Sequence, residues 1–310
     1  MRDVIDAVRI AHAEHASGRA DQPTRVTVKI PGATGSILPM PAALPQQGAV
    51  GLKLLSVFPE NPAHGLPLLS AVVVLVNPQT GRCDAILDGG ALTAYRTAAA
   101  SAIATDLLAR RGPCTLGLIG AGLEARTHVK AVGCVRQIEE IFVWSRTQET
   151  AARFADEVGA ENLTVRVCDD PRLVVESATI LCTVTPSPEP IVLGSWFRPG
   201  LHVNAVGTHW PDRREIDTEA VVRSRVVVDS RDAQSAECGD LRIPLAEGAI
   251  TADHFADELG ELICGTKPGR SNESEITMYQ SVGVAIQDVA TARMLVDAAR
   301  GRGVGTEIDL

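Results

Sequence analysis

The spacing of apolar positions changes along the chain. Residues 3–16 carry Val4, Ile5, Val8 and Ala11 at helical spacing, which predicts an amphipathic helix. Alternating or apolar segments broken by Pro and Gly follow, and they predict an antiparallel, strand-rich region. Its strands are expected at 25–30, 36–40, 50–57, 68–76 and 83–87.

A different pattern begins at Ala91. Residues 91–110 contain neither Gly nor Pro and predict a helix whose Ala and Ser face can lie close to a neighbour. Apolar strands and helix-like stretches then alternate, the arrangement that builds a parallel, doubly wound sheet. These strands are expected at 115–119, 141–144, 165–168, 179–184, 202–206 and 226–229. Residues 276–300 predict one long helix that can return to the strand-rich region.

Composition narrows the class of protein. The 310 residues are 45% hydrophobic, enough to bury the cores of two domains of ordinary size. A net charge of −9 without a basic patch argues against a nucleic-acid partner, as do aromatic residues at only 3%. No apolar run approaches the roughly 20 residues of a membrane span. The charged N-terminal helix has no signal-peptide core, so we expect a soluble cytoplasmic protein with no membrane partner.

The seven cysteines are an odd number, widely dispersed and without a CxxC pair. We interpret them as reduced and mostly buried, and we expect neither disulfides nor a metal site. A protein that acts on small molecules remains.

The strand at 115–119 runs into Gly120-Ala121-Gly122-Leu123-Glu124-Ala125, a GxGxxA element placed between a strand and a helix. Gly120 permits the tight turn, Gly122 allows the backbone to approach a pyrophosphate, and the following helix offers amide donors. A dinucleotide contacting Gly120, Gly122 and Leu123 is therefore expected. The alternative is a Gly-rich turn of an ordinary α/β domain.

The end of the next strand bears on the choice of dinucleotide. An acid there accepts hydrogen bonds from the ribose 2′-hydroxyl, whereas a 2′-phosphate requires a cation. This chain has Ser145-Arg146-Thr147, a guanidinium between two hydroxyls. We therefore expect NADP(H) as the preferred cofactor, with NAD(H) possible. Alternatively, Arg146 stacks on the adenine or is solvated.

Three cations lie in the other part of the chain: Arg25, Lys53 and Arg96. Lys53 falls within the apolar strand VGLKLLSV, where a charge is costly unless it meets an anion or a wet cleft. Alone, Lys53 is better explained as a solvent-facing strand residue, because alternate positions of a strand often face solvent.

Taken together, these segments resemble the ornithine cyclodeaminase/mu-crystallin family over nearly the whole chain. The resemblance adds several ordered motifs to the three cations and the glycine turn. They are Phe58-Pro59-Glu60-Asn61, Gly65-Leu66-Pro67, Asp88-Gly89, Thr93-Ala94, Arg96-Thr97-Ala98-Ala99-Ala100-Ser101, Asn204-Ala205-Val206-Gly207, Glu237-Cys238-Gly239-Asp240 and Ser281-Val282-Gly283.

The resemblance implies an α/β fold with two domains and a homodimer. Residues 1–112 with 276–310 would form an α+β substrate-binding and dimerisation domain, and 113–275 a Rossmann dinucleotide-binding domain. It also implies that Arg25, Lys53 and Arg96 face the nicotinamide across a cleft. Further cofactor contacts are expected at Thr97, Thr183, Val184, Val206, Gly207 and Ser281.

Two departures from the family bear on the reaction. Cyclodeaminases of this family carry an Asp shortly after the Asn-Ala-Val-Gly strand, but here Thr208 and His209 follow, with no carboxylate until Asp212. A Glu that cyclodeaminases place near the early Met-Pro is missing from Leu38-Pro39-Met40-Pro41 as well. His209, or Thr208 if the loop shifts by one, takes the position of the Asp. An imidazole can act as acid or base near neutral pH, and a plain loop histidine is the alternative.

These observations favour an NAD(P)H-dependent imine reductase or amino-acid dehydrogenase acting on an imino or amino acid. Arg96 and Arg25 would grip the substrate carboxylate, and Lys53 would contact the imine nitrogen or deliver a proton. Two alternatives stay open. One is an ornithine or lysine cyclodeaminase that releases ammonia with catalytic NAD, and the other is a non-catalytic binder of dinucleotide and small ligands.

Overall fold

The computed structural model describes residues 1–207 and 209–308, and its contacts divide the chain into two compact units. One unit holds Asp3–Arg96 and the chain from Val284 onward. The other holds Met1–Arg2 and Thr97–Gly283. The chain crosses between them inside a helix, at Arg96, and again at Gly283, whereas the sequence predicted boundaries at 112 and 276. None of the described helices is long and apolar enough to cross a bilayer.

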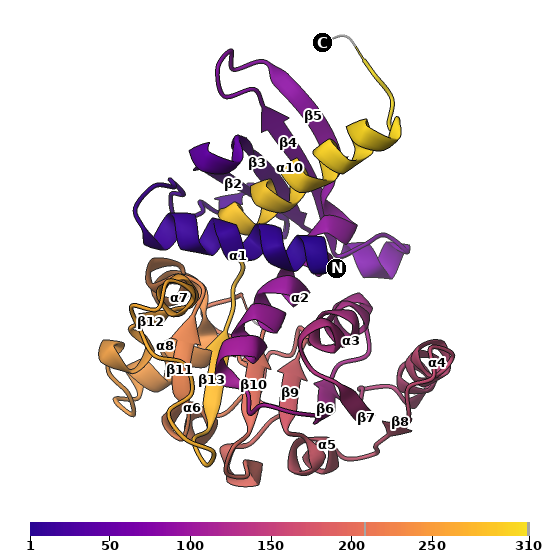
Figure 1. Cartoon of the computed structure of the whole chain (residues 1–310). Coiled ribbons are helices and arrows are strands. Elements are labelled where there is room, and N and C mark those ends of the chain that lie inside the picture. The colour runs from indigo at the N-terminus through magenta and orange to yellow at the C-terminus, as the bar shows by residue number, and fades with distance from the viewer. Residues whose placement is uncertain (208, 309–310) are drawn as a thin grey trace. The chain divides into compact units, whose positions relative to one another are not determined.

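The first unit, the antiparallel unit, contains a five-stranded sheet in the order β1-β2-β3-β4-β5 with antiparallel neighbours (Figure 1). Its elements are α1 (Arg2–Ala16), β1 (Val28–Lys29), β2 (Ser36–Leu44), η1 (Pro45–Gln47), β3 (Ala49–Val57), η2 (Asn61–His64), β4 (Leu69–Val76), β5 (Cys83–Asp88) and α10 (Ala285–Arg302).

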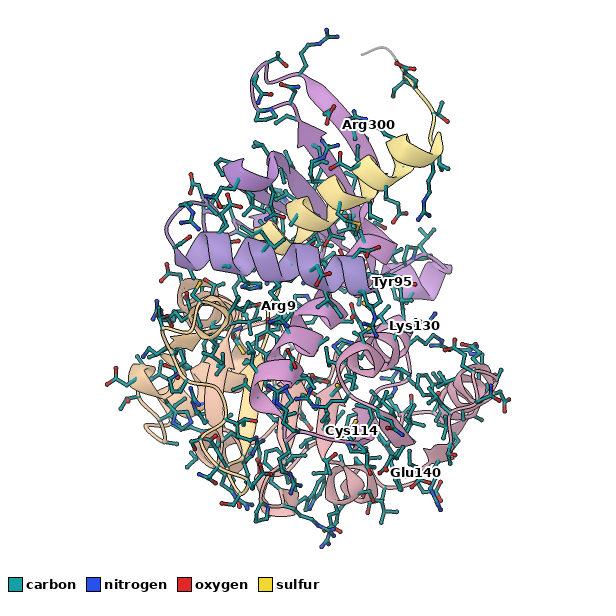
Figure 2. All side chains as sticks on the ribbon, in the orientation of Figure 1. Arg9, Tyr95, Cys114, Lys130, Glu140 and Arg300 are labelled. Atoms are coloured by element: carbon teal, nitrogen blue, oxygen red, sulfur yellow. The ribbon has the colours of Figure 1, made fainter. Side chains whose placement is uncertain are left out.

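Helix α10 covers one face of this sheet and packs on β2, β3 and β4. Because strand side chains alternate between faces, Met40, Lys53 and Val73 share the covered face through in-register pairs, and all three are buried. Arg293 and Arg300 on α10 bind Asp84 of β5 at 2.6 and 2.7 Å, which ties the helix to the edge of the sheet (Arg300 is labelled in Figure 2).

The second unit, the parallel unit, contains an eight-stranded sheet in the order β12-β11-β13-β10-β9-β6-β7-β8, with parallel neighbours throughout. Its strands are β6 (Cys114–Ile119), β7 (Ile138–Trp144), β8 (Val165–Val167), β9 (Ile180–Thr183), β10 (His202–Ala205), β11 (Arg225–Val228), β12 (Asp257–Glu258) and β13 (Thr277–Gln280). Val, Ile and Leu fill the central strands, as expected where both faces of a parallel sheet are covered.

Helix α2 (Gly89–Leu108) begins in the antiparallel unit and continues into the parallel unit. The remaining helices of the parallel unit are α3 (Leu123–Val135), α4 (Gln148–Gly159), α5 (Pro171–Ser177), η3 (Gly194–Trp196), α6 (Thr218–Val222), α7 (Arg231–Glu237), α8 (Gly239–Ala246), η4 (Ala252–Phe255) and α9 (Leu259–Ile263). The α/β class predicted from the sequence is confirmed.

Two sequence predictions are wrong in detail. The expected strand 25–30 is reduced to Val28–Lys29, because Val26 is 62% exposed and no neighbouring strand pairs with 25–27 among the described residues. The expected helix 276–300 is a strand followed by a helix. Thr277–Gln280 pair with both β10 and β11 in the parallel unit, and α10 begins only at Ala285, after Gly283 with φ +78°.

Candidate active site

The turn between β6 and α3 has the geometry of an anion-binding turn. Gly120 adopts φ +110°, and a Cβ there would lie 2.9 Å from the carbonyl oxygen of Val184. Gly122 is the N-cap of α3, and a Cβ there would meet nothing within 4 Å. No side chain caps this helix end, so the first-turn amides can bind a phosphate. These features fit a dinucleotide pyrophosphate at Gly120, Gly122 and Leu123.

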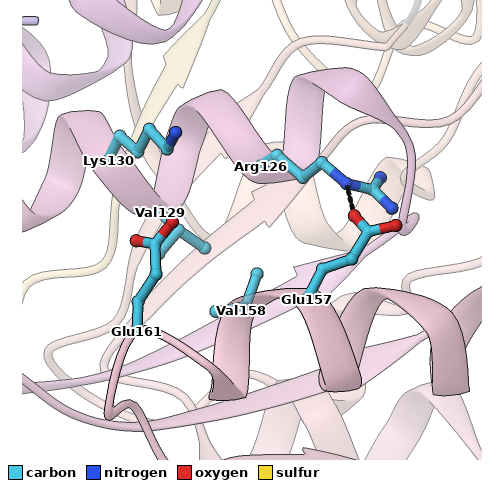
Figure 3. Close-up of a pocket in the computed structure, with 6 residues that line it drawn as sticks. All are labelled: Arg126, Val129, Lys130, Glu157, Val158 and Glu161. Atoms are coloured by element: carbon cyan, nitrogen blue, oxygen red, sulfur yellow. Dashed lines mark hydrogen bonds and ion pairs between the residues drawn. The ribbon is translucent and has the colours of Figure 1, made fainter.

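Arg126 fixes the orientation of this turn. Its Nη1 donates to the carbonyl oxygens of Ala121 and Gly122 at 2.8 and 2.9 Å, and its Nε donates to Glu157 of α4 (Figure 3). The turn's carbonyls are thereby held by Arg126 rather than left to face an anion. The cavity beside this pair is about 160 Å³, well below the roughly 300 Å³ at which ligand pockets begin.

The end of β7 carries the residues expected to select the dinucleotide. Ser145 is half-buried, Arg146 is exposed, and Thr147 is the N-cap of α4 with its hydroxyl 2.7 Å from that of Thr150. Within the described chain Arg146 forms no hydrogen bond or ion pair, so its guanidinium is available to a ligand.

A buried carboxylate joins the ends of two further strands. Glu215 accepts hydrogen bonds from the Thr183 hydroxyl (2.9 Å), from the amide and hydroxyl of Thr185 (both 2.6 Å) and from the Gly207 amide (2.8 Å). Burial, with the charge of Asp240, raises the pKa of Glu215 to about 7. The loops containing Val184 and Val206 are therefore held together at the carboxyl edge of the sheet, where ligands of open α/β sheets bind.

Asp229, the residue after β11, likewise holds the loop that follows β13. Its carboxylate accepts from the Ser281 hydroxyl (3.0 Å) and from the amides of Val282 (3.0 Å) and Gly283 (2.7 Å). Ser281 and Thr97, two of the predicted cofactor contacts, are 1% and 5% exposed.

The antiparallel unit holds a cluster of buried charges. Asp288 of α10 is bound by the Lys53 ammonium at 2.9–3.0 Å and by the Arg96 Nε at 2.9 Å. The three side chains come from β3, α2 and α10 and are at most 6% exposed. Two cations share one carboxylate, so this Lys53–Arg96–Asp288 cluster carries an excess positive charge when Lys53 is protonated.

Burial lowers the pKa of Lys53 to about 8. Asp288 raises this pKa, whereas Arg96 and the half-buried Arg25 lower it. Arg96 and Arg25 therefore both lie within electrostatic range of Lys53.

His209 belongs to the parallel unit, in the loop after β10. The centroid of its ring lies 3.7 Å from that of Trp210. In a separate contact, the Arg213 guanidinium lies 4.8 Å from the centroid of the Trp210 ring. Thr208, the alternative position, is outside the described residues.

Sequence reasoning missed Asp288, Gln287 and His12. Gln287 Oε1 accepts from Arg96 Nη1 at 2.9 Å, and Gln287 Nε2 lies 3.0 Å from His12 Nε2. The sequence feature that could have identified Gln287 and Asp288 is that the two polar residues are adjacent in a stretch of small and apolar residues, VGVAIQDVATA.

Comparison with known proteins gives concordant results. The family model described as "Ornithine cyclodeaminase/mu-crystallin family" matches residues 1–303. The chain is 35% identical to a Delta(1)-pyrroline-2-carboxylate reductase of Bacillus cereus over 311 aligned positions, which cover 100% of this chain and 95% of that protein.

Two solved structures are similar over almost their whole length. The Delta(1)-pyrroline-2-carboxylate reductase of Thermococcus litoralis, in complex with NADH and L-proline, has a TM-score of 0.96 and 40% identity, covering 98% of this chain and 95% of that one. An archaeal alanine dehydrogenase dimer with bound NAD has a TM-score of 0.93 and 32% identity, covering 100% and 95%.

Proposed function

Since the chain belongs to the ornithine cyclodeaminase/mu-crystallin family, we propose that it is an NAD(P)H-dependent oxidoreductase that reduces a C=N bond next to a carboxylate. A cyclic ketimine such as pyrroline-2-carboxylate is the preferred substrate class, with open-chain imino acids second; the reverse reaction is amino-acid oxidation. The observation that carries the proposal is the buried Lys53–Arg96–Asp288 cluster, which has more positive than negative charge.

A substrate carboxylate supplies the missing negative charge. Asp288 occupies Nε of Arg96 and Gln287 occupies Nη1, which leaves Nη2 without a hydrogen-bond partner among the described residues. A carboxylate bound there is joined by a charge-assisted hydrogen bond and offsets the charge of Arg96. Arg25, half-buried and within electrostatic range of Lys53, is the second carboxylate contact.

Lys53 supplies the proton. Reduction of a neutral imine adds a hydride to carbon and a proton to nitrogen, and the dinucleotide supplies the hydride when bound. With a pKa of about 8, Lys53 is protonated near neutral pH and acidic enough to donate to the nitrogen. His209, whose imidazole can take up or release a proton, is the second proposed acid or base.

The residues that would hold the dinucleotide follow the carboxyl edge of the parallel sheet. The amides after Gly120 and Gly122 and the first residue of α3, Leu123, would bind the pyrophosphate. Ser145, Arg146 and Thr147 would bind a 2′-phosphate, which favours NADP(H) over NAD(H). The loops with Thr183, Val184, Val206 and Gly207, with Thr97 and Ser281, would support the nicotinamide end.

We further propose a homodimer formed through the outer face of the antiparallel sheet. The face opposite α10 carries Leu54 and Ile86, which are 37% and 53% exposed, together with half-buried Leu52, Val72 and Val74. An exposed apolar patch on an ordered sheet is typical of a protein interface. The alanine dehydrogenase of similar structure is a dimer, which supports a second copy as the partner.

The decisive experiment supplies cyclic and open-chain imino acids together with NADH or NADPH. We expect loss of reduced nicotinamide and formation of the matching amino acid. Lys53→Met should lower kcat by about 100-fold or more while dinucleotide binding, measured by fluorescence, persists. If no imino acid causes loss of NADH or NADPH, the proposal is refuted. Ammonia release from ornithine without net nicotinamide change would instead establish a cyclodeaminase, and full activity of Lys53→Met would remove Lys53 from the mechanism.

A further inference from the structure

The cationic cluster is held in place by residues of a helix that the sequence analysis did not assign to the site. Asp288 is 0% exposed in the first turn of α10. Its Oδ1 accepts from both Lys53 Nζ (3.0 Å) and Arg96 Nε (2.9 Å), and its Oδ2 lies 2.9 Å from Lys53 Nζ. A single carboxylate therefore fixes the separation of an ammonium and a guanidinium that come from β3 and α2.

The neighbouring Gln287 acts on Arg96 from a second direction. Its Oε1 accepts from Arg96 Nη1, so its Nε2 must face His12 Nε2, 3.0 Å away. Burial, with the charge of His15, lowers the pKa of His12 to about 3. His12 is therefore neutral at ordinary pH and can accept from the Gln287 amide. This hydrogen bond determines which way the amide points, and the amide in turn fixes the rotation of the guanidinium.

The energetics distinguish these contacts from ordinary surface pairs. A buried cation that loses its carboxylate is left uncompensated, and here two cations would lose the same one. Both would also remain buried next to each other. The charge of Asp288 consequently affects the protonation of Lys53 as well as its position.

From these contacts we propose that Asp288 and Gln287 are positioning residues of the reductase: Asp288 holds Lys53 charged and aimed, and Gln287 fixes the guanidinium of Arg96 for a substrate carboxylate. The inference rests on the proposed function for its substrate. Its geometry concerns only the antiparallel unit, and its first test uses neither substrate nor cofactor.

That test uses the small number of lysines. The chain has four, Lys29, Lys53, Lys130 and Lys267, so the full-length protein labelled with [ε-¹³C]lysine gives a simple spectrum. Lys53→Arg identifies the Lys53 signal. Lys130, exposed on α3 (Figure 3), is an internal reference. We expect Lys53 to titrate near pH 8 in the unmodified protein, and Asp288→Asn to lower this midpoint by about 1 unit or more.

The second readout is catalytic. In Asp288→Asn the loss of imino-acid reduction on raising the pH should move to lower pH by the same amount as the Lys53 titration. Gln287→Met should leave the Lys53 midpoint in place and raise KM for the imino acid about tenfold, with a smaller change in kcat. If Asp288 and Gln287 had a purely structural role, the variants would be less stable, but the Lys53 titration midpoint, the pH at which activity is lost and the ratio of KM to kcat would not change.

The results of these experiments distinguish the positioning roles of Asp288 and Gln287 from the proposed reductase function. An unchanged Lys53 midpoint in folded Asp288→Asn overturns the role of Asp288, whatever the protein reduces. An unchanged KM in Gln287→Met overturns the role of Gln287. If Asp288→Asn does not fold, Asp288→Glu keeps the charge and displaces it; we then expect a retained midpoint with reduced kcat, and wild-type kcat would overturn the positioning. Failure of the unmodified protein to reduce any imino acid refutes the proposed function, and the lysine titration still decides the role of Asp288.

Discussion

A Cβ placed on Gly120 would lie 2.9 Å from the carbonyl oxygen of Val184, the residue that follows β9. Two residues further on, a Cβ placed on Gly122 would meet no atom within 4 Å. The two glycines of one turn are therefore required for different reasons. Gly120 is required by the protein itself, because φ +110° and the contact both exclude a side chain, whereas Gly122 is required only if a ligand comes close to its backbone.

This difference predicts opposite results for two substitutions. Gly120→Ala should lower the free energy of unfolding by about 1–3 kcal/mol. Gly122→Ala should retain wild-type stability and raise the Kd for the dinucleotide at least about tenfold. Thermal unfolding and fluorescence titration measure the two quantities. Gly159→Ala, also in open space in the same unit, is the control and should change neither. Wild-type affinity in Gly122→Ala would contradict a pyrophosphate at this turn.

Arg146→Ala tests the choice of dinucleotide. The exposed guanidinium has no protein partner in the described chain, so its removal should leave stability unchanged. We expect kcat/KM for NADPH to fall about tenfold or more through loss of charge-assisted hydrogen bonds, and that for NADH to change little. Arg153→Ala, an exposed arginine on neighbouring α4, is the matched control. Equal effects on both dinucleotides would mean that Arg146 does not recognise a 2′-phosphate.

His128→Gln tests a pH dependence of stability. His128 is buried, with Nδ1 2.7 Å from the Glu124 carbonyl oxygen and Nε2 2.9 Å from the Ser101 hydroxyl. Burial lowers its pKa from 6.5 to about 4. A depressed pKa contributes stability above pH 6.5 that is lost as the pH falls towards 4, because the unfolded chain binds the proton first.

We therefore expect the unfolding free energy of the wild type to fall more steeply than that of His128→Gln between pH 6.5 and 4, by up to about 1.4 kcal/mol per pH unit. Denaturant unfolding at several pH values gives the two slopes. His64→Gln, at an exposed histidine, should keep the wild-type slope. Parallel slopes for the wild type and His128→Gln would exclude a buried neutral imidazole.

Leu54→Glu tests the proposed dimer face. A carboxylate on the outer face of the antiparallel sheet would have to be desolvated in an interface, so the variant should sediment as a monomer while remaining folded. Leu173→Glu, at a leucine 52% exposed on α5 in the other unit, should leave the mass unchanged. Dimeric Leu54→Glu, or a monomeric wild type, would contradict the proposed face.

The periodicity of the sequence was enough to predict both sheets and most strands, because alternation and apolar runs are local signals. It was not enough for β13. Thr277–Gln280 lie next to a helical segment and are recognisable as a strand only through pairing with β10 and β11, which is a long-range property. The strand predicted at 25–30 was shortened for the opposite reason: the local pattern was present, but only Val28 and Lys29 pair with β2, and no strand pairs with 25–27 among the described residues.

The site shows the same division. Lys53 could be singled out because a lysine in an apolar strand is unusual. Asp288 lies in a comparable apolar stretch, VGVAIQDVATA, but helical periodicity does not mark it as inward-facing, because residues 285–292 are all buried and the start of α10 has no polar face. A carboxylate in a helix is ordinarily read as solvent-exposed. Only the packing of α10 on β2, β3 and β4 places it next to the cations.

The position of β13 between β10 and β11 also constrains how the protein is made. The ribosome releases β11 and β12 before β13 exists, so these strands have no neighbour linking them to the rest of their sheet until residue 280 has emerged. Helix α10, which covers the antiparallel sheet, is synthesised later still. A nascent chain therefore exposes strand edges and an apolar sheet face until residues 277–302 have emerged, a condition that favours aggregation and the binding of chaperones.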